Sequence, residues 1–167
     1  MNLNKNRLAI TLLLLIIGLT IQSSHVRARI SEKAFGQGKT DEETACKRLS
    51  EVKQVPFKGE SINDEAYNDI VSRGKAVIPC LIREITNTTR MKDPRSAPTY
   101  PDFRVGDLAF FLLVDITKIP FEQMLPYSVK FKIKDEGVYA YFEYVEHLNN
   151  RKALQNKWRA WWAKHGS

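Results

Sequence analysis

The sequence predicts a mostly α-helical fold, a compact domain of about five helices. Three observations indicate this class. Apolar residues recur at spacings of three and four in several segments, most clearly at 77–85 and 154–162. Helix start and stop signals, such as Asn, Asp, Pro or Gly, flank these segments. The run 108–114 is apolar on all sides and is therefore predicted to lie in a central, buried helix, with a buried strand as the alternative.

The first 28 residues have the pattern of a secretory signal peptide. Lys5 and Arg7 precede Leu8–Ile21, a run of 14 residues without charge. This run is short for a membrane-spanning helix, which needs about 20 apolar residues. Val26-Arg27-Ala28 predicts cleavage after Ala28, with Ser23 or Ser24 as alternatives. We therefore expect an exported protein, periplasmic or secreted, with an uncleaved signal anchor as the alternative.

Removal of residues 1–28 would leave one domain. Residues 29–40 are polar and predict a flexible leader, so that 41–167 forms a single helical domain. Loss of Lys5, Arg7 and Arg27 lowers the formal charge from +7 to +4. Because the remaining basic residues are not clustered, the sequence does not predict nucleic-acid binding, and it predicts membrane contact only through the signal segment.

Three helices are expected in the first half of the domain. The first is predicted at 41–54 and the second at 64–73, where Asn63 is the expected N-cap and Gly74 the C-terminal stop. The third begins near 75–78. Pro79 falls in its first turn, where a missing N–H costs little, and apolar residues continue to Ile85.

Two short helices joined by a tight glycine turn, the second carrying the pattern AVIPCLIREI, resemble one repeat of the HEAT-like α-hairpin class. The resemblance covers residues 63–86, about one repeat unit. It implies a helical scaffold that presents a surface to a protein partner.

The second half of the domain is predicted to contain three more helices and one strand. Helices are expected at 103–117, with Asp102 as N-cap, at 137–148, and at 151–165, with Asn150 as N-cap. Residues 128–134 (SVKFKIK) alternate apolar residues with lysines, which predicts a short strand. Its candidate partner is 55–57, and a helical turn or an extended connection is the alternative.

The two cysteines of the domain are predicted to form a disulfide. Cys46 and Cys80 are the only cysteines in the sequence, and an oxidising compartment favours their pairing. The bridge would stabilise the fold by roughly 3–4.5 kcal/mol in the chain-entropy model. Two buried free thiols are the alternative.

No catalytic or metal-binding motif is evident, and we expect neither an enzyme nor a cofactor. His147 follows Glu143 and Glu146, but a zinc site of the HxxEH type would need a second histidine at position 143. A Cys80–His147 dyad is disfavoured because Cys80 lies on an apolar helix, where burial suppresses the thiolate. Asp107 and Asp115 are expected to have capping or core-edge roles.

Two surfaces are the main candidates for binding. Residues 87–102, here the long loop, contain three prolines and no apolar periodicity, and loops of this length are often functional. The expected partner-binding residues are Arg90, Lys92, Arg95 and Tyr100. In the C-terminal helix, Trp158, Trp161 and Trp162 are expected to dock the helix on the core, with Trp161 partly exposed as a possible stacking platform for sugars. Lys130, Lys132 and Lys134 are expected to form a solvated strand face, with contact to anionic lipid or glycan as the alternative.

The function predicted from these features is a non-catalytic, exported protein-binding module. One form is a periplasmic immunity or inhibitor protein that occludes a toxin or a cell-wall enzyme with its long loop. The alternatives are a cell-wall glycan-binding protein or enzyme that uses the aromatic C-terminal helix, and a scaffold within an envelope assembly.

Overall fold

The computed structural model describes residues 43–56 and 61–166 and shows a helical domain. The segments predicted as signal peptide and leader lie outside the described residues. The chain is helical at 43–47 and continues in η1 (Arg48–Glu51), α2 (Glu65–Ser72), η2 (Gly74–Val77) and α3 (Ile78–Glu84). After the long loop come α4 (Val105–Thr117), η3 (Phe121–Met124), α5 (Tyr127–Glu136), α6 (Tyr139–Val145) and α7 (Leu148–His165). Residues 42–167 group as one compact unit.

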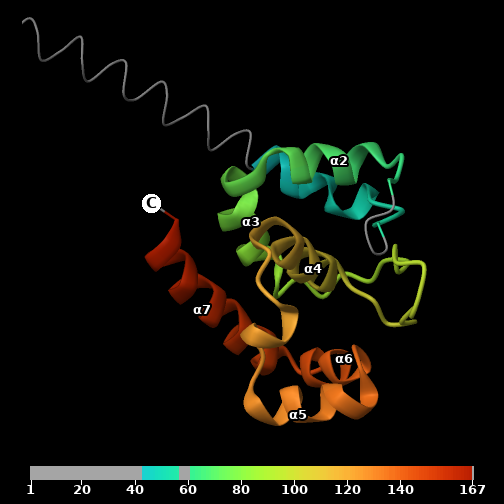
Figure 1. The fold of residues 1–167 in the computed structure, drawn as a ribbon. Coiled ribbons are helices and arrows are strands. Elements are labelled where there is room, and N and C mark those ends of the chain that lie inside the picture. The colour runs from blue at the N-terminus through green and yellow to red at the C-terminus, as the bar shows by residue number, and fades with distance from the viewer. Residues whose placement is uncertain (1–42, 57–60, 167) are drawn as a thin grey trace, which may run out of the picture. The chain divides into compact units, whose positions relative to one another are not determined.

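Helix α4 is the centre of this domain, as the apolar run predicted. The first helices, at 43–56 and 61–84, lie on one side of α4, the pair α5 and α6 lies on the opposite side, and α7 runs alongside (Figure 1). Leu108, Phe110 and Leu113 of α4 are fully buried. The helix form, and not the alternative strand, is therefore confirmed for 108–114.

Close backbone contact joins α4 to the end of α3. The N–H of Gly106 donates to the carbonyl of Asn87 over 3.0 Å. A Cβ atom at position 106 would collide with the carbonyl oxygens of Ile85 and Asn87. Glycine is thus required at this position by space, since only a residue without a side chain allows the approach.

Several predicted helix boundaries are confirmed and several are shifted. Gly74 has a φ of +53° directly after α2, and Pro79 lies in the first turn of α3, as expected. The expected N-caps Asn63, Asp102 and Asn150 are wrong. Asp64, Arg104 and His147 hold these positions instead. The first helix also tightens into η1 and ends at Glu51, before position 54.

The predicted strand at 128–134 is wrong, because these residues lie in α5. Val129 and Ile133, four residues apart, pack toward the core in a helical arrangement. Lysine and apolar residues alternate along the sequence, as in a strand, but the backbone of this segment is helical. In the predicted partner segment, the N–H of Val55 donates to the carbonyl of Pro94. The described residues contain one isolated antiparallel bridge, Arg90 to Arg104, and no strand.

A buried polar cluster joins three helices around α4. Arg151 of α7 forms an ion pair with Asp107 of α4 over 2.8 Å, and the hydroxyl of Tyr141 in α6 donates to the same carboxylate over 3.0 Å. Gln155 of α7 donates to the carbonyls of Ile82 and Arg83, which the end of α3 would otherwise leave without partners. Polar contacts therefore fix the relative positions of α3, α4, α6 and α7.

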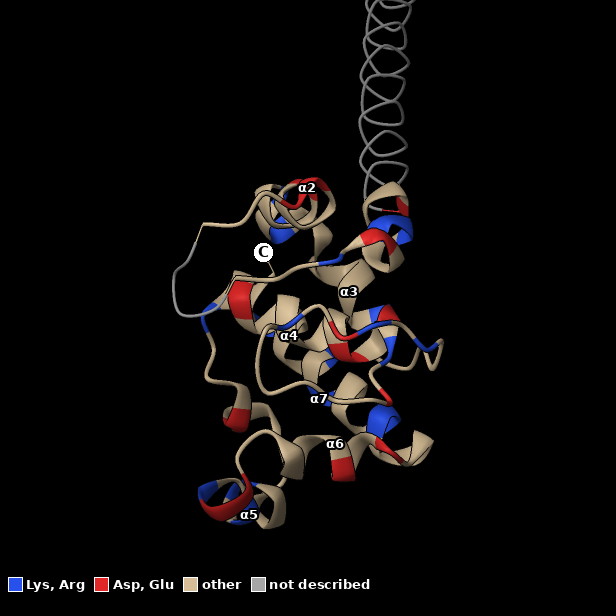
Figure 2. Cartoon of the chain, turned by 90° about the vertical axis from the view of Figure 1, so that its right-hand side faces the viewer, with Lys and Arg blue, Asp and Glu red and all other residues tan. Residues whose placement is uncertain are grey.

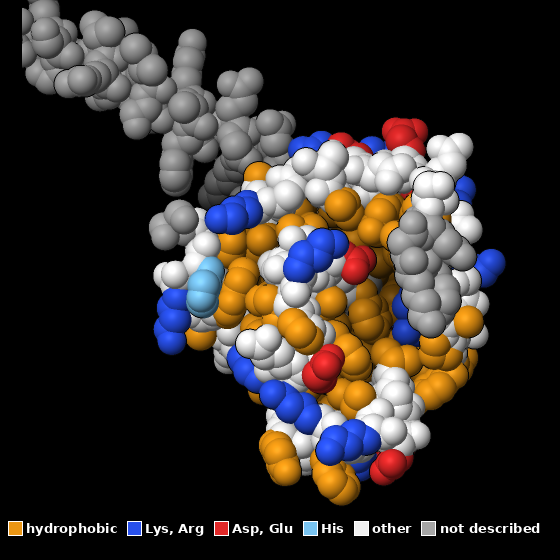
Figure 3. All heavy atoms as spheres, viewed as in Figure 1, with side chains coloured by type: hydrophobic (Ala, Val, Ile, Leu, Met, Phe, Trp, Pro, Cys, Tyr) orange, Lys and Arg blue, Asp and Glu red, His pale blue; other side chains and the backbone are white. Residues whose placement is uncertain are grey.

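Charged side chains are spread over the surface of the domain. Among the α-helices, α3 and α5 carry both basic and acidic residues, α2, α4 and α6 carry only acidic ones, and α7 carries only basic ones (Figure 2). On the face drawn in Figure 3, Lys and Arg side chains alternate with acidic and apolar ones.

Candidate functional site

The long loop is closed at its base by backbone hydrogen bonds. The N–H of Met91 donates to the carbonyl of Phe103 over 3.0 Å, and the N–H of Val105 donates to that of Thr89 over 2.9 Å. These two bonds flank the isolated bridge between Arg90 and Arg104. The two ends of the loop are thus held side by side, which fixes where the loop leaves the domain.

An aspartate at the centre of the loop ties its two halves together. Asp93 accepts hydrogen bonds from the N–H of Arg95 over 3.0 Å and from that of Tyr100 over 2.8 Å. The Arg95 guanidinium also pairs with both oxygens of the Asp93 carboxylate, with Nε at 2.9 Å from Oδ1. The side chains of Arg95 and Asp93 are only 12% and 4% exposed. The conformation of the loop is therefore held by contacts of largely covered side chains.

Three aromatic rings of the core surround the Arg95 guanidinium. Its central carbon lies 5.2, 5.0 and 4.7 Å from the ring centroids of Phe103, Phe111 and Phe142. The Tyr100 ring stacks on Phe142, with centroids 4.1 Å apart. Pairing with a carboxylate and packing against ring faces offset the free-energy cost of removing a guanidinium from water. Arg95 and Tyr100 thus anchor the loop to the core.

The four predicted partner-binding residues divide into two groups. Arg95 and Tyr100 face inward, as described. Lys92 is exposed, and the Arg90 side chain is 73% exposed and forms an ion pair with Asp102 over 2.8 Å. Residues 96–99, here the loop tip, are all exposed. The surface available to a partner therefore consists of the loop tip together with Arg90 and Lys92.

A small pocket lies beneath the loop tip. Its volume is about 140 Å³, and Arg95, Phe111 and Asp115 are among its lining residues. Burial raises the pKa of Asp115, opposed by the nearby Lys118 and by a hydrogen bond with Tyr67. Burial and the neighbouring Asp115 raise the pKa of Tyr67 to about 12. The volume is below the roughly 300–1,000 Å³ of typical small-molecule sites.

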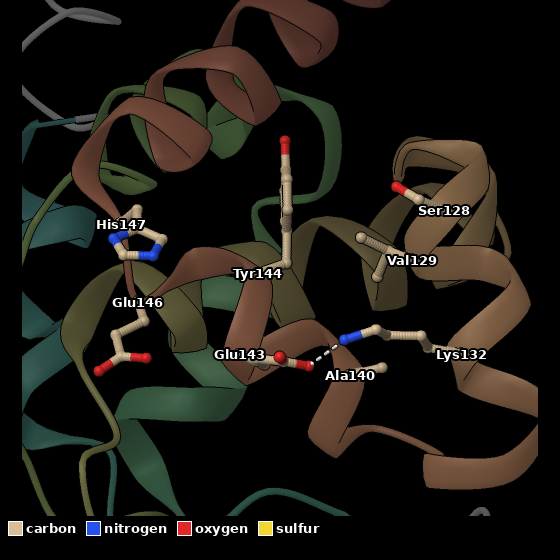
Figure 4. Close-up of a pocket in the computed structure, with 8 residues that line it drawn as sticks. All are labelled: Ser128, Val129, Lys132, Ala140, Glu143, Tyr144, Glu146 and His147. Carbon is tan, nitrogen blue, oxygen red and sulfur yellow. Dashed lines mark hydrogen bonds and ion pairs between the residues drawn. The ribbon is translucent and has the colours of Figure 1, made fainter.

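A larger groove of about 310 Å³ lies between α5 and α6 and reaches the start of α7. Figure 4 shows that Lys132 and Glu143 form an ion pair across it, over 2.8 Å. Ser128 lies on the opposite wall from His147, and Glu146 points away from Lys132 (Figure 4). Because the hydroxyl, the imidazole and the carboxylates do not converge on one point, the groove lacks the nucleophile–base geometry of an active site.

The described residues also contain no group of three or more His, Cys, Asp or Glu side chains placed to bind a metal ion. His147 is exposed and is the N-cap residue of α7. Glu143 pairs with Lys132, and Glu146 and His147 line the groove between α5 and α6.

The two cysteines form the predicted disulfide. Cys46 and Cys80 are bonded, with Cα atoms 6.3 Å apart, and the bridge joins the helical segment 43–47 to α3. A bonded Cys80 has no thiolate, which removes the Cys80–His147 dyad as a catalytic candidate.

The tryptophans of α7 differ in burial. Trp158 is fully buried, whereas Trp161 and Trp162 are half-buried. Trp161 lies edge-on to Trp158, with centroids 5.5 Å apart, and its ring stacks on His165 at 4.9 Å. One ring face of Trp161 is thus covered by a side chain of its own helix, which leaves less of the ring for stacking on a sugar.

Sequence reasoning missed the residues that build this site from within. Asp93 was given no role, Phe142 was expected only in the apolar face of the helix at 137–148, and Arg95 was expected at the surface. The short spacing of Asp93 and Arg95 was a usable signal for a local ion pair, whereas the rings that enclose Arg95 come from separate segments.

No protein-family model, curated protein or solved structure matches this chain. Within the part of the chain that the structure describes, none of the helices combines the length and the apolar character needed to span a membrane.

Proposed function

We propose that this chain is an exported, non-catalytic protein-binding module whose contact surface is the loop tip together with Arg90 and Lys92. One observation carries the proposal: the buried Asp93–Arg95 pair and its aromatic surroundings hold the long loop in one shape while residues 96–99 remain exposed. A loop ordered before binding loses little conformational entropy when a partner docks, and this favours affinity.

The disulfide supports an exported protein, because such bonds persist in oxidising compartments and are rare in the cytosol. The signal-like segment predicted at 1–28 is consistent with the same location. In the form that we favour, the partner is a toxin or a cell-wall enzyme, and the loop occludes its active-site cleft. The HEAT-like resemblance of 63–86 fits a helical scaffold behind such a loop and stays a prediction.

Affinity capture from envelope extract, with quantitative mass spectrometry, tests this surface. We expect the wild-type protein to retain a specific partner that the variant Arg90→Glu/Lys92→Glu retains at least tenfold less. Thr99→Trp should have the same effect, because a bulky ring at the exposed tip blocks docking. The matched control Lys47→Glu/Lys75→Glu makes the same charge change at exposed positions outside the loop and should retain the partner. Equal capture by all four proteins would contradict the proposal.

The glycan-binding alternative rests on the half-exposed Trp161. Pull-down on insoluble peptidoglycan separates it from the first proposal. Retention that is lost in Trp161→Ala, but kept in Trp162→Ala and in Arg90→Glu/Lys92→Glu, would favour the glycan-binding function. We expect no Trp161-dependent retention, because His165 already stacks on this ring.

A further inference from the structure

Helix α5 exposes two large aromatic side chains on one face. Tyr127 is 82% exposed and Phe131 is 60% exposed. The two residues are four positions apart, so they are neighbours on the surface of a helix. Their exposure contrasts with Val129 and Ile133, which point toward the core. The helix therefore has an outward aromatic face that no other described part of the chain covers.

Two lysines flank these rings. In the predicted strand, Lys130, Lys132 and Lys134 would have shared one side, but the helix separates them. Lys132 pairs with Glu143 in the groove. Lys130 and Lys134 follow Tyr127 and Phe131 by three positions each, and Lys134 Nζ lies 5.9 Å from the centroid of the Phe131 ring. Within the described residues, neither Lys130 nor Lys134 forms an ion pair.

A third lysine adds positive charge beside this face. Lys157 of α7 donates to the carbonyls of Gln123 and Leu125 over 3.0 and 3.3 Å. Burial lowers the pKa of Lys157, and the positive charge of Lys130 lowers it further. Lys157 and Lys130 therefore place two positive charges near the N-terminal end of α5. Asp135 is exposed and follows Phe131 by four positions, so one acidic side chain borders this face beside the lysines.

The position of α5 indicates what could cover this surface. The helix lies at an outer end of the domain, with the long loop elsewhere (Figure 1). In the same view, hydrophobic side chains stand out from this end beside basic ones (Figure 3). A protruding aromatic surface with adjacent lysines fits a flat, negatively charged boundary better than a cleft. The aromatic rings can enter the headgroup region while the lysine side chains reach the phosphates.

We propose that the face of α5 formed by Tyr127, Lys130, Phe131 and Lys134 docks on the surface of a bilayer that contains anionic phospholipids. The contact is peripheral and is separate from the predicted signal segment at 8–21. It would hold the domain against the membrane while leaving the long loop free for a protein partner.

Site-specific photocross-linking on the full-length chain tests this contact independently of the N-terminal segment. A benzophenone amino acid is placed at position 127 or 131, and at exposed position 76 as control, and the protein is mixed with vesicles. We expect lipid adducts from 127 and 131 with vesicles of phosphatidylcholine and phosphatidylglycerol. We expect few with phosphatidylcholine alone and few from position 76. Lys130→Glu/Lys134→Glu should lower the adduct yield at 127 about tenfold, since each lysine near an anionic surface contributes to binding.

Matched variants separate charge from aromatic contact. Lys47→Glu/Lys75→Glu, which makes the same charge change away from α5, should leave the adduct yield at 127 unchanged. Phe131→Ser should lower it. Circular dichroism confirms that each variant remains helical. Three outcomes would overturn the proposal: equal adducts with zwitterionic vesicles, equal adducts from position 76, or protein–protein adducts from 131 without vesicles, which would assign this face to a second copy of the chain.

Discussion

Two arginine–aspartate pairs in the described part of the chain, one buried and one largely covered, differ in what they connect. Arg151 and Asp107 lie on α7 and α4, and their side chains are 2% and 1% exposed. Arg95 and Asp93 lie two residues apart in the long loop, under the surface. The first pair joins helices that are distant in sequence, so it supports the whole fold. The second closes a local turn, so it determines the shape of one surface segment. The difference in sequence separation thus distinguishes a pair that joins distant helices from a pair that shapes one loop, the proposed binding surface.

The largest effect is expected from breaking the pair between helices. Arg151→Met leaves Asp107 buried without its cation, and breaking a buried pair by removing one partner costs about 3–5 kcal/mol. Burial already raises the pKa of Asp107, against the opposing effects of Arg151, the Arg104 N–H and Tyr141. Urea unfolding measures the change in free energy. Lys152→Met, at an exposed neighbouring position, is the control and should change stability by less than about 0.5 kcal/mol. A similar small change for Arg151→Met would show that the pair does not support the fold.

The disulfide is a second connection between distant segments, and its loss should have a comparable effect. Its 34-residue separation corresponds to about 4 kcal/mol in the chain-entropy model. The double variant Cys46→Ser/Cys80→Ser should therefore unfold at markedly lower urea concentration. A thiol assay on unfolded, unreduced wild-type protein should detect no free thiol. Detection of two thiols would mean that the bond does not form.

A smaller and pH-dependent effect is expected at Asp64, the N-cap of α2. Burial raises the pKa of this carboxyl. Hydrogen bonds from the N–H groups of Tyr67, Lys53, Gln54 and Ala66 outweigh burial and hold the pKa below its usual value of 3.8. The ionised carboxylate therefore stabilises the fold above pH 3.8, and this contribution is lost as the pH falls through the lowered pKa.

The variant Asp64→Asn isolates this contribution, because it keeps one side-chain acceptor for the cap but has no charge to lose. The difference in stability between wild type and Asp64→Asn should be largest at neutral pH and should shrink below about pH 3.8. Urea unfolding at several pH values measures it. A difference that stays constant down to pH 2 would show that ionisation of Asp64 does not contribute.

Local sequence signals predicted the fold class and several of its details. The apolar run at 108–114 identified the central helix, and Gly74 and Pro79 indicated the junction between α2 and α3. The presence of two cysteines predicted the disulfide. Each of these signals depends on neighbouring residues or on a unique pair. The strand prediction at 128–134 failed because a short alternating pattern also fits a helix, and packing of Val129 and Ile133 against the core decided between them.

The interior of the candidate site could not be predicted from local pattern. An arginine in a proline-rich loop is usually exposed, and Arg95 is buried because Phe103, Phe111 and Phe142 come together from three segments. The same holds for Arg151, whose position in α7 gave no sign of its pairing with Asp107. The N-caps were misplaced by one to three residues, and two of the helices begin after Arg104 and His147, residue types without a strong N-cap preference.

Hydrogen exchange in the long loop tests the central claim, that the Asp93–Arg95 pair shapes the binding surface without supporting the whole fold. The amide of Tyr100, which donates to Asp93, is compared in wild type and Arg95→Met. We predict that the Tyr100 amide exchanges faster in Arg95→Met and that this variant captures less partner. The α4 amides should exchange at the rate that they have in wild type, after correction for any change in the free energy of unfolding. The account would be contradicted if Tyr100 exchanged as slowly in Arg95→Met as in wild type.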